Sequence, residues 1–242
     1  MEKHTIHIGT SGWSYKHWRN KFYPQNLKIK DQFGYYAKKF TTVEINSTFY
    51  GVPSDETIIN WGKKVPEDFV YVIKANRFIT HLKKLRNPDE ILLPFLHKMK
   101  LLGNKLGLIL FQLPPSLNAD LKLLEKFLQK LPLHQRFAFE FRHSSWYADD
   151  VYDLLRKYNA AFCIYELAGH ISPLITTADF VYLRLHGPTA NKYQGSYSDE
   201  ALRKWAEQCK TWLKSDDVFV YFDNDEEGYA AFNALQLIEL MK

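Results

Sequence analysis

Charged residues occur near the ends of several short apolar segments, where they alternate with aliphatic or aromatic residues. Three are basic and three are acidic: Lys74, Arg142, Arg184, Glu44, Glu140 and Asp223. Successive side chains of a β-strand point to opposite faces, so each segment turns its charges to one side and its apolar side chains to the other. A buried charge without a partner costs several kcal/mol. The set must therefore pair internally or be completed by a ligand, and the sequence leaves both alternatives open.

The basic members of the set favour an anionic ligand. Two guanidinium groups suit a carboxylate or a phosphate, which they contact through paired N–H donors. Lys74, expected to lie near both arginines, should have a lowered pKa, which suits a general base or a Schiff-base amine. His186 follows Arg184 by two positions and is the expected proton carrier, although a histidine that only hydrogen-bonds a loop fits as well. We predict Glu44, Lys74, Glu140 and His186 as the catalytic residues.

Neither a metal nor an organic cofactor is expected. Glu44, Glu140, His186 and Asp223 could offer hard ligands to a divalent ion, but the three cationic side chains on the same face would repel it. The sequence also lacks the spacings of zinc sites, the Walker loop, the HExxH motif and the GxSxG nucleophile elbow.

The elements that position these residues alternate between strand and helix. Apolar or alternating segments predict strands at 6–10, 42–47, 70–75, 107–113, 137–142, 161–166, 180–186 and 218–223. Helices are predicted at 31–39, 55–63, 89–101, 118–130, 149–158, 198–214 and 227–241, and several begin at Asp, Asn or Ser, as N-caps do. The segment 169–177 has a proline and little helical pattern, so the sixth helix should be short or missing.

This alternation indicates parallel strands joined by right-handed crossovers. A chain of 242 residues matches one TIM barrel, typically about 250 residues, and it shows no internal repeat or linker. An open doubly wound sheet is the alternative, but no GxGxxG motif follows the first strand. We predict a single (β/α)8 TIM barrel over residues 1–242, with its site at the C-terminal ends of the strands.

Further polar and aromatic residues are predicted to face the same end of the barrel. Polar residues on the inward register and rings in the following loops suit a sugar or a base. The alternative for the rings is that they pack loop against loop. The predicted substrate-binding residues are Arg142, Arg184, Asn46, Asn76, Trp13, Tyr50, His81, Gln112, His143, Trp146, Tyr221, Asp223 and Asn224.

Composition predicts a folded, cytoplasmic protein. Hydrophobic residues make up 46% of the chain, and Cys163 and Cys209 form no CxxC pair, so they are expected to be reduced. The N-terminus lacks the apolar segment of a signal peptide, and no apolar run approaches the ~18 residues that span a bilayer. The net charge of +5 fits an anionic ligand but does not by itself indicate DNA binding.

Several motifs carry a resemblance to a known family. They are GTSGWSY at 9–15, VEINSTFY at 43–50, ITH at 79–81, FQLPP at 111–115, FEFRHSSW at 139–146 and RLHG at 184–187. In this order they resemble the "domain of unknown function 72" family, also called YecE-like or UPF0759, from residue 6 to about 240. The resemblance implies a TIM barrel distantly related to sugar isomerases and to the endonuclease IV superfamily, and no established reaction. The family's motif at the eighth strand is Tyr-Phe-Asn-Asn, whereas this chain has Asp223, so a neutral amide serves relatives there.

Two functional hypotheses follow. The first is a metal-independent enzyme, of isomerase, lyase or hydrolase type, that acts on a small anionic, sugar-like or phosphate-bearing substrate. The basic residues would hold the anion, Glu140 and His186 would transfer protons, and Glu44 and Asn46 would orient them, with Trp13, Tyr50 and Trp146 as walls. The alternative, which is less favoured, is a nucleic-acid or nucleotide binder, such as an endonuclease IV-like phosphodiesterase. Clustering of Lys83, Lys84 and Arg86 around the site would favour that alternative, and their dispersal over the side of the barrel would favour the first.

Overall fold

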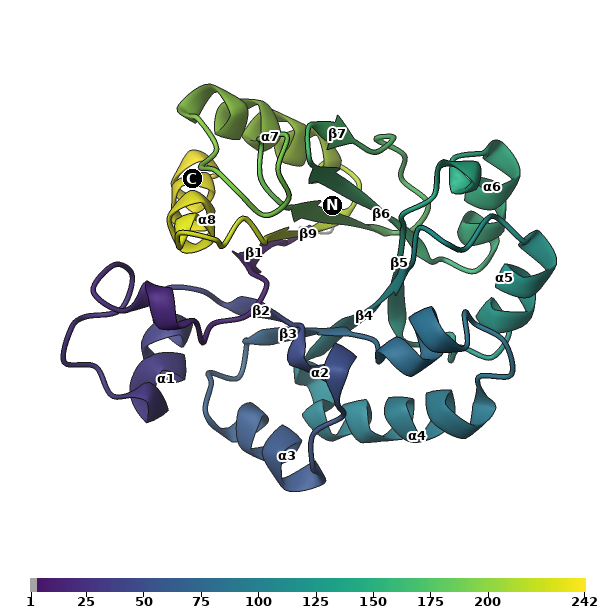
Figure 1. Ribbon diagram of the computed structural model, residues 1–242, viewed down its shortest axis with the longest axis horizontal. Coiled ribbons are helices and arrows are strands. Elements are labelled where there is room, and N and C mark those ends of the chain that lie inside the picture. The colour runs from purple at the N-terminus through teal and green to yellow at the C-terminus, as the bar shows by residue number, and fades with distance from the viewer. Residues whose placement is uncertain (1–3) are drawn as a thin grey trace.

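Eight parallel strands form a nearly closed barrel in the computed structural model, which describes residues 4–242 (Figure 1). The barrel strands are β1 Ile6–Thr10, β2 Thr42–Ile45, β3 Val70–Lys74, β4 Leu106–Leu113, β5 Arg136–Phe141, β6 Ala161–Leu167, β8 Phe180–Leu185 and β9 Asp217–Phe222. They pair in the order β1-β9-β8-β6-β5-β4-β3-β2. The predicted TIM-barrel fold is confirmed, and the strand boundaries agree within a few residues.

The two ends of this strand order meet at a seam between β1 and β2. There, an isolated parallel bridge joins Ser11 to Glu44. A glycine on β1 allows the close approach, because a Cβ atom on Gly9 would lie 2.6 Å from the backbone oxygen of Thr42. The seam therefore depends on a residue without a side chain and on a buried glutamate.

Helices cover the outside of the barrel (Figure 1). They are α1 Gln32–Ala37, α2 Ser47–Tyr50, α3 Asp55–Lys63, α4 Asp89–Met99, α5 Leu121–Leu128, α6 Asp149–Lys157, α7 Asp199–Trp212 and α8 Tyr229–Leu240. Three have the side-chain N-caps that their sequences suggest: Ser54, Asp120 and Ser198 accept hydrogen bonds from backbone N–H groups in the first turn. Among the described helices, none combines the length and apolar character needed to cross a bilayer.

Three short elements lie outside the regular alternation of strands and helices. The segment after β6 forms β7, His170–Ile171, which pairs antiparallel with β6, so the prediction that the sixth helix is short or missing is confirmed. The sequence did not predict the one-turn helix α2 after β2, nor the π-helix Phe78–Leu82 after β3. Such short helical turns are too brief to show a helical period.

The barrel interior has an apolar floor beneath a charged upper layer. The floor comprises Val72, Leu108, Leu110, Ala138, Ala161, Cys163, Phe180, Tyr182, Phe219 and Tyr221. In β3, β5, β8 and β9, the next inward positions toward the C-terminal end are Lys74, Glu140, Arg184 and Asp223. The predicted inward register therefore places these charges together above a dry core.

The seam gives a first prediction. Gly9→Ala should lower the free energy of unfolding by about 1–3 kcal/mol, because the added methyl group meets backbone that must shift. Gly34→Ala in α1 is the matched control, since its Cβ would have nothing within 4 Å, and should be neutral or stabilising by up to ~1 kcal/mol. Urea unfolding measures both. Equal stability of the two variants would contradict the close packing of the seam.

Candidate functional site

Arg184 is the most fully engaged residue at the C-terminal end of the barrel. Its guanidinium is buried and contacts Glu44 through two hydrogen bonds, Nε to Oε2 at 2.8 Å and Nη2 to Oε1 at 2.6 Å. Nη1 donates to Oε2 of Glu140 at 2.6 Å and to Nε2 of His186 at 3.2 Å. Nη2 also donates to Oδ2 of Asp223 at 3.4 Å. A guanidinium carries five N–H donors, so Arg184 has none left for a ligand.

Glu44 is saturated in the same way. Besides the two bonds from Arg184, it accepts one from the Ser11 hydroxyl at 2.6 Å and one from the Tyr182 hydroxyl. A carboxylate has about four lone-pair positions. Glu44 is also fully buried. Its carboxylate therefore positions Arg184 and closes the seam, and it has no free oxygen to offer a substrate.

Glu140 is the second buried carboxylate with its oxygens occupied. It accepts hydrogen bonds from Arg184, from the Nε atom of Arg142 and from Nε2 of Gln112 at 2.9 Å. Burial alone would raise the pKa of Glu140, but Arg142 and Arg184 outweigh it and hold that pKa well below its usual range. Glu140 is therefore an anion that anchors two arginines.

The hydrogen bonds of His186 define its tautomer. Nε2 lies 3.2 Å from Nη1 of Arg184 and 3.2 Å from Nη2 of Arg142, and guanidinium nitrogens can only donate. Nε2 is thus the acceptor, and Nδ1 carries the hydrogen that it donates to Oδ2 of Asp223 at 3.0 Å. Burial, followed by the charge of Arg184, lowers the pKa of His186, so the ring is neutral at pH 7.

Lys74 differs from all of these residues. Among residues 4–242, its Nζ atom makes no hydrogen bond and no ion pair within 4.0 Å; it lies 4.7 Å from the centre of the Phe49 ring. Burial, and then the charge of Arg184, lower the pKa of Lys74 to about 8. The charges of Glu140, Glu44 and Asp223 act in the opposite direction and do not restore it.

Arg142 is the second residue with free donors. Its Nε and Nη2 atoms are engaged, but Nη1 has no hydrogen-bond partner in the described part of the chain. The guanidinium lies 4.7 Å from the centre of the Tyr165 ring. His81 lies in the same neighbourhood, since burial, then Lys74 and then Arg142 lower its pKa. Lys74 and Arg142 thus present the unused donors of the charged cluster, which we define as Glu44, Lys74, Glu140, Arg142, Arg184, His186 and Asp223.

The predicted amides serve mainly to hold loops. Nδ2 of Asn76 donates to the Thr48 carbonyl at 3.0 Å, and its Oδ1 accepts from the Phe78 N–H at 3.0 Å. Nδ2 of Asn224 donates to the Gly195 carbonyl and to Asn233, each at 2.8 Å.

The predicted substrate-binding residues Tyr221 and Asn46 have surroundings that differ from those of these two amides. Tyr221 lies in the floor, 2.5 Å from the Thr42 hydroxyl. Asn46 directly follows β2, and its Oδ1 is buried without a hydrogen-bond partner among the described residues.

The predicted wall residues do not gather at the charged cluster. Trp146 is fully buried, donates to the Leu117 carbonyl at 2.8 Å and stacks on Phe141. Trp13 packs against Phe33 and Trp61. These two tryptophans follow the loop-packing alternative.

The remaining two predicted loop residues, Tyr50 and His143, have other neighbours. Tyr50 is 74% exposed and lies edge-on to Phe49. His143 caps the short helix Ser144–Trp146 through Nδ1, which accepts from the Ser145 N–H.

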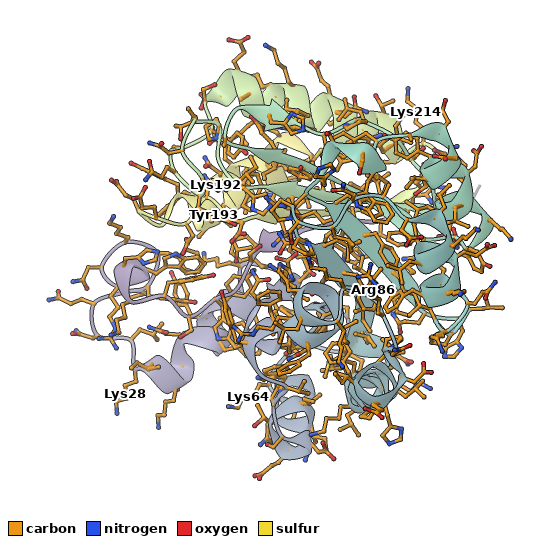
Figure 2. The ribbon with its side chains drawn as sticks, turned by 45° about the vertical axis from the view of Figure 1, so that its right-hand side comes forward. Lys28, Lys64, Arg86, Lys192, Tyr193 and Lys214 are labelled. Atoms are coloured by element: carbon orange, nitrogen blue, oxygen red, sulfur yellow. The ribbon has the colours of Figure 1, made fainter. Side chains whose placement is uncertain are left out.

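Besides Tyr182 in the floor, three rings lie over or beside residues of the cluster: Phe49, Tyr165 and Tyr193. Tyr193 lies in the loop between β8 and α7, with its ring 5.5 Å from that of His186 (Figure 2). Neither Phe49 nor Tyr193 was among the predicted site residues. The one-turn helix α2 rotates Phe49 rather than Tyr50 toward Lys74, and Tyr193 has a φ of 64°, which no alternating pattern reveals.

Fold and cluster together define a parallel α/β barrel protein with a buried ion network at the C-terminal ends of its strands. Comparison with known families identifies the family to which it belongs. The family model described as "Protein of unknown function DUF72" matches residues 7–242, and the chain belongs to this family.

Relatives agree with this assignment. The chain is 26% identical to UPF0759 protein YunF of Bacillus subtilis over 98% of its own length and 94% of that protein. It is 31% identical to UPF0759 protein YecE of Escherichia coli over 59% of its length and 50% of that protein. A crystal structure of a DUF72 family protein from Thermotoga maritima has a TM-score of 0.90 at 30% identity, covering 98% and 99% of the two chains.

The network predicts the cost of removing its central cation. Arg184→Met should lower the free energy of unfolding by about 3–5 kcal/mol, because it leaves buried Glu44 without an ion-pair partner and removes one of the two arginines that pair with Glu140. The exposed Arg203 of α7 provides the control, and Arg203→Met should change stability by less than about 0.5 kcal/mol. A loss of less than about 1 kcal/mol in Arg184→Met, measured by urea unfolding, would contradict the network.

Lys74 should behave in the opposite way. Its folded pKa lies below its unfolded pKa, so the unfolded state binds more protons, and the charged form destabilises the fold below about pH 8. Lys74→Met should therefore be more stable than the wild type at pH 7. The difference should narrow as pH rises from about 8 to 10.5. Unfolding of both proteins across this range measures the effect, and a destabilised variant at pH 7 would show that Lys74 has a partner.

Proposed function

We propose that this DUF72 protein is an enzyme that binds a small anionic, sugar-like or phosphate-bearing substrate at the C-terminal end of the barrel, without a metal. The observation that carries the proposal is the difference between Arg184 and Lys74. Arg184 has acceptors for all its donors, whereas the ammonium of Lys74 has no acceptor among residues 4–242, although it lies near charged groups. Ammonium donors that the protein leaves unused suit an anionic ligand.

Arg142 would supply the second contact. Its Nη1 atom is free, while Nε and Nη2 fix the guanidinium plane against Glu140 and His186. A guanidinium already fixed by other bonds loses little freedom on binding a phosphate or carboxylate. Its side chain is 11% exposed, so the group is shielded from bulk water yet reaches solvent.

Acid–base roles follow from which groups are free. Glu44 and Glu140 would position the arginines rather than exchange protons, since their oxygens are occupied. Lys74, with a pKa of about 8, is suited to exchange a proton near neutral pH. His186 could accept a proton at Nε2 only after both arginine donors withdraw, and an anion that attracts Arg142 would remove only one of them.

A metal-free site fits the same donor set. The oxygens of Glu44 and Glu140 point at N–H donors, and Lys74, Arg142 and Arg184 would repel a cation. The rings of Phe49, Tyr165 and Tyr193 border the cluster and could contact the apolar face of a sugar.

The basic residues after β3 give little support to nucleic-acid binding. Nζ of Lys84 donates to the Ser116 carbonyl at 3.2 Å. Arg86 lines a groove with Lys126 and Lys130, beside α4 and α5, and lies well apart from Tyr193 (Figure 2). Lys84 is thus engaged by the loop after β4, and Arg86 lies beside the outer helices, which supports a small-molecule substrate more than a nucleic acid.

Thermal melting against a ligand panel tests the proposal. The panel comprises inorganic phosphate, sugar phosphates, sugar acids, uncharged sugars and short DNA. An anion present at a concentration of 100 times its dissociation constant should stabilise the native state by about 2.7 kcal/mol. It should therefore raise the midpoint temperature of thermal unfolding. The rise should be lost in Lys74→Met and in Arg142→Met, and retained in the control Arg86→Met. A rise that persists in both site variants, or that only DNA produces, would refute the proposed site.

A further inference from the structure

Two lysines of the described chain are largely buried, and their surroundings differ. Lys105 is 8% exposed, and its Nζ atom donates to the Gly62 and Val65 carbonyls at 3.1 and 3.4 Å and pairs with Glu67 at 3.1 Å. An ammonium has three donors, so Lys105 is fully held as a cation. Lys74 has no such partner among residues 4–242, and its Nζ atom lies over the face of the Phe49 ring.

This setting increases the fraction of Lys74 that is present as the neutral amine. At pH 7, one pH unit below the Lys74 pKa of about 8, roughly one tenth of the molecules carry the unprotonated amine. A lysine with an ordinary pKa of 10.5 carries almost none. No carboxylate within 4.0 Å and no carbonyl holds the nitrogen of Lys74 in the described structure, so its lone pair is free to react.

We propose that Lys74 is a nucleophile that forms an imine with an anionic aldehyde or ketone, whose carboxylate or phosphate is bound by Arg142. This inference rests on the proposed function and narrows its substrate to a carbonyl compound. The two residues would have complementary roles. Arg142 would offer its free Nη1 to the anion, and Lys74 would offer its free amine to the carbonyl carbon.

The step balances without a further reactant. The amine lone pair attacks the carbonyl carbon, and the C=O π electrons move to the oxygen, which takes up a proton. The nitrogen, which becomes positively charged in the attack, gives up one proton as the carbinolamine forms. Its second proton, in net terms, leaves with the hydroxyl as water, which leaves a C=N bond between Lys74 and the substrate. Nothing is oxidised or reduced, since an amine and a carbonyl give an imine and one water.

One carboxylate oxygen of the cluster has no hydrogen-bond donor among the described residues. Oδ2 of Asp223 accepts from His186 and Arg184, whereas Oδ1 accepts no hydrogen bond from the described residues. Asp223 lies close enough to Lys74 to raise its pKa, although burial and Arg184 dominate. Oδ1 is therefore the free carboxylate oxygen that a protonated imine could contact.

Reductive trapping tests the inference. The wild-type protein is incubated with sodium cyanoborohydride and one carbonyl compound in each reaction. The carbonyl compounds are glyoxylate, pyruvate, glyceraldehyde 3-phosphate and dihydroxyacetone phosphate. Hydride reduction of the imine should add the mass of the carbonyl compound less one oxygen atom. Intact mass and peptide mapping should locate a single adduct on Lys74. Glycerol 3-phosphate, which has no carbonyl group, should slow the trapping of the phosphorylated compounds.

Two variants make the result specific. Lys74→Arg should lose the adduct, because a guanidinium does not form it, and should keep the melting shift with inorganic phosphate, because the cation remains. Lys105→Arg should keep the adduct at Lys74. Adducts spread over exposed lysines, and unchanged in Lys74→Arg, would overturn the inference.

Failure of the imine and failure of the anion site can be told apart. If inorganic phosphate or glycerol 3-phosphate raises the midpoint through Arg142, and none of the carbonyl compounds is trapped, the imine is wrong and the anion site stands. If no anion of either experiment binds and nothing is trapped, both proposals fail.

Discussion

The paired hydrogen bonds between Arg184 and Glu44 are the interaction on which the rest of this structure depends. Arg184 belongs to β8 and Glu44 to β2, which are not neighbours in the strand order, so the pair crosses the barrel interior. Glu44 also holds Ser11 at the seam between β1 and β2. One buried ion pair thus closes the barrel and sets the geometry of its upper end. Because both groups are fully buried, removing either partner would leave an uncompensated charge.

This pair also divides the charged cluster into two parts. The donors of Arg184 and the carboxylate oxygens of Glu44 and Glu140 are all engaged, by one another and by neighbouring side chains of the described chain. The cationic side chains of Lys74 and Arg142 stand at the edge of that network, close enough to be influenced by it and only partly bound to it. The sequence left open whether the charges pair with one another or are completed by a ligand. The two alternatives therefore apply to different residues of the same cluster. The first describes the saturated residues, and our proposal assigns the second to Lys74 and Arg142.

Much of the fold and part of the cluster could be predicted from the sequence. Strand alternation has a period of two, so Glu44, Glu140 and Arg184 could be assigned to the interior from their apolar neighbours alone. Which of them are saturated could not be predicted, because that depends on distances between side chains from different strands. The loop rings were harder still. Trp13 and Trp146 are large apolar groups that gain most by packing, and Phe49 faces Lys74 only because Ser47–Tyr50 forms a turn of helix.

The most direct test of this account is the titration of the Lys74 amine by NMR, with and without inorganic phosphate. We expect its pKa to be about 8 in the free protein, because burial and Arg184 disfavour the charged form. Phosphate should move this pKa upward, since a bound anion favours the ammonium. A pKa near the ordinary lysine value, unchanged by phosphate, would mean that Lys74 is solvated or paired like any surface lysine, and the division between a saturated network and a free cation would be wrong.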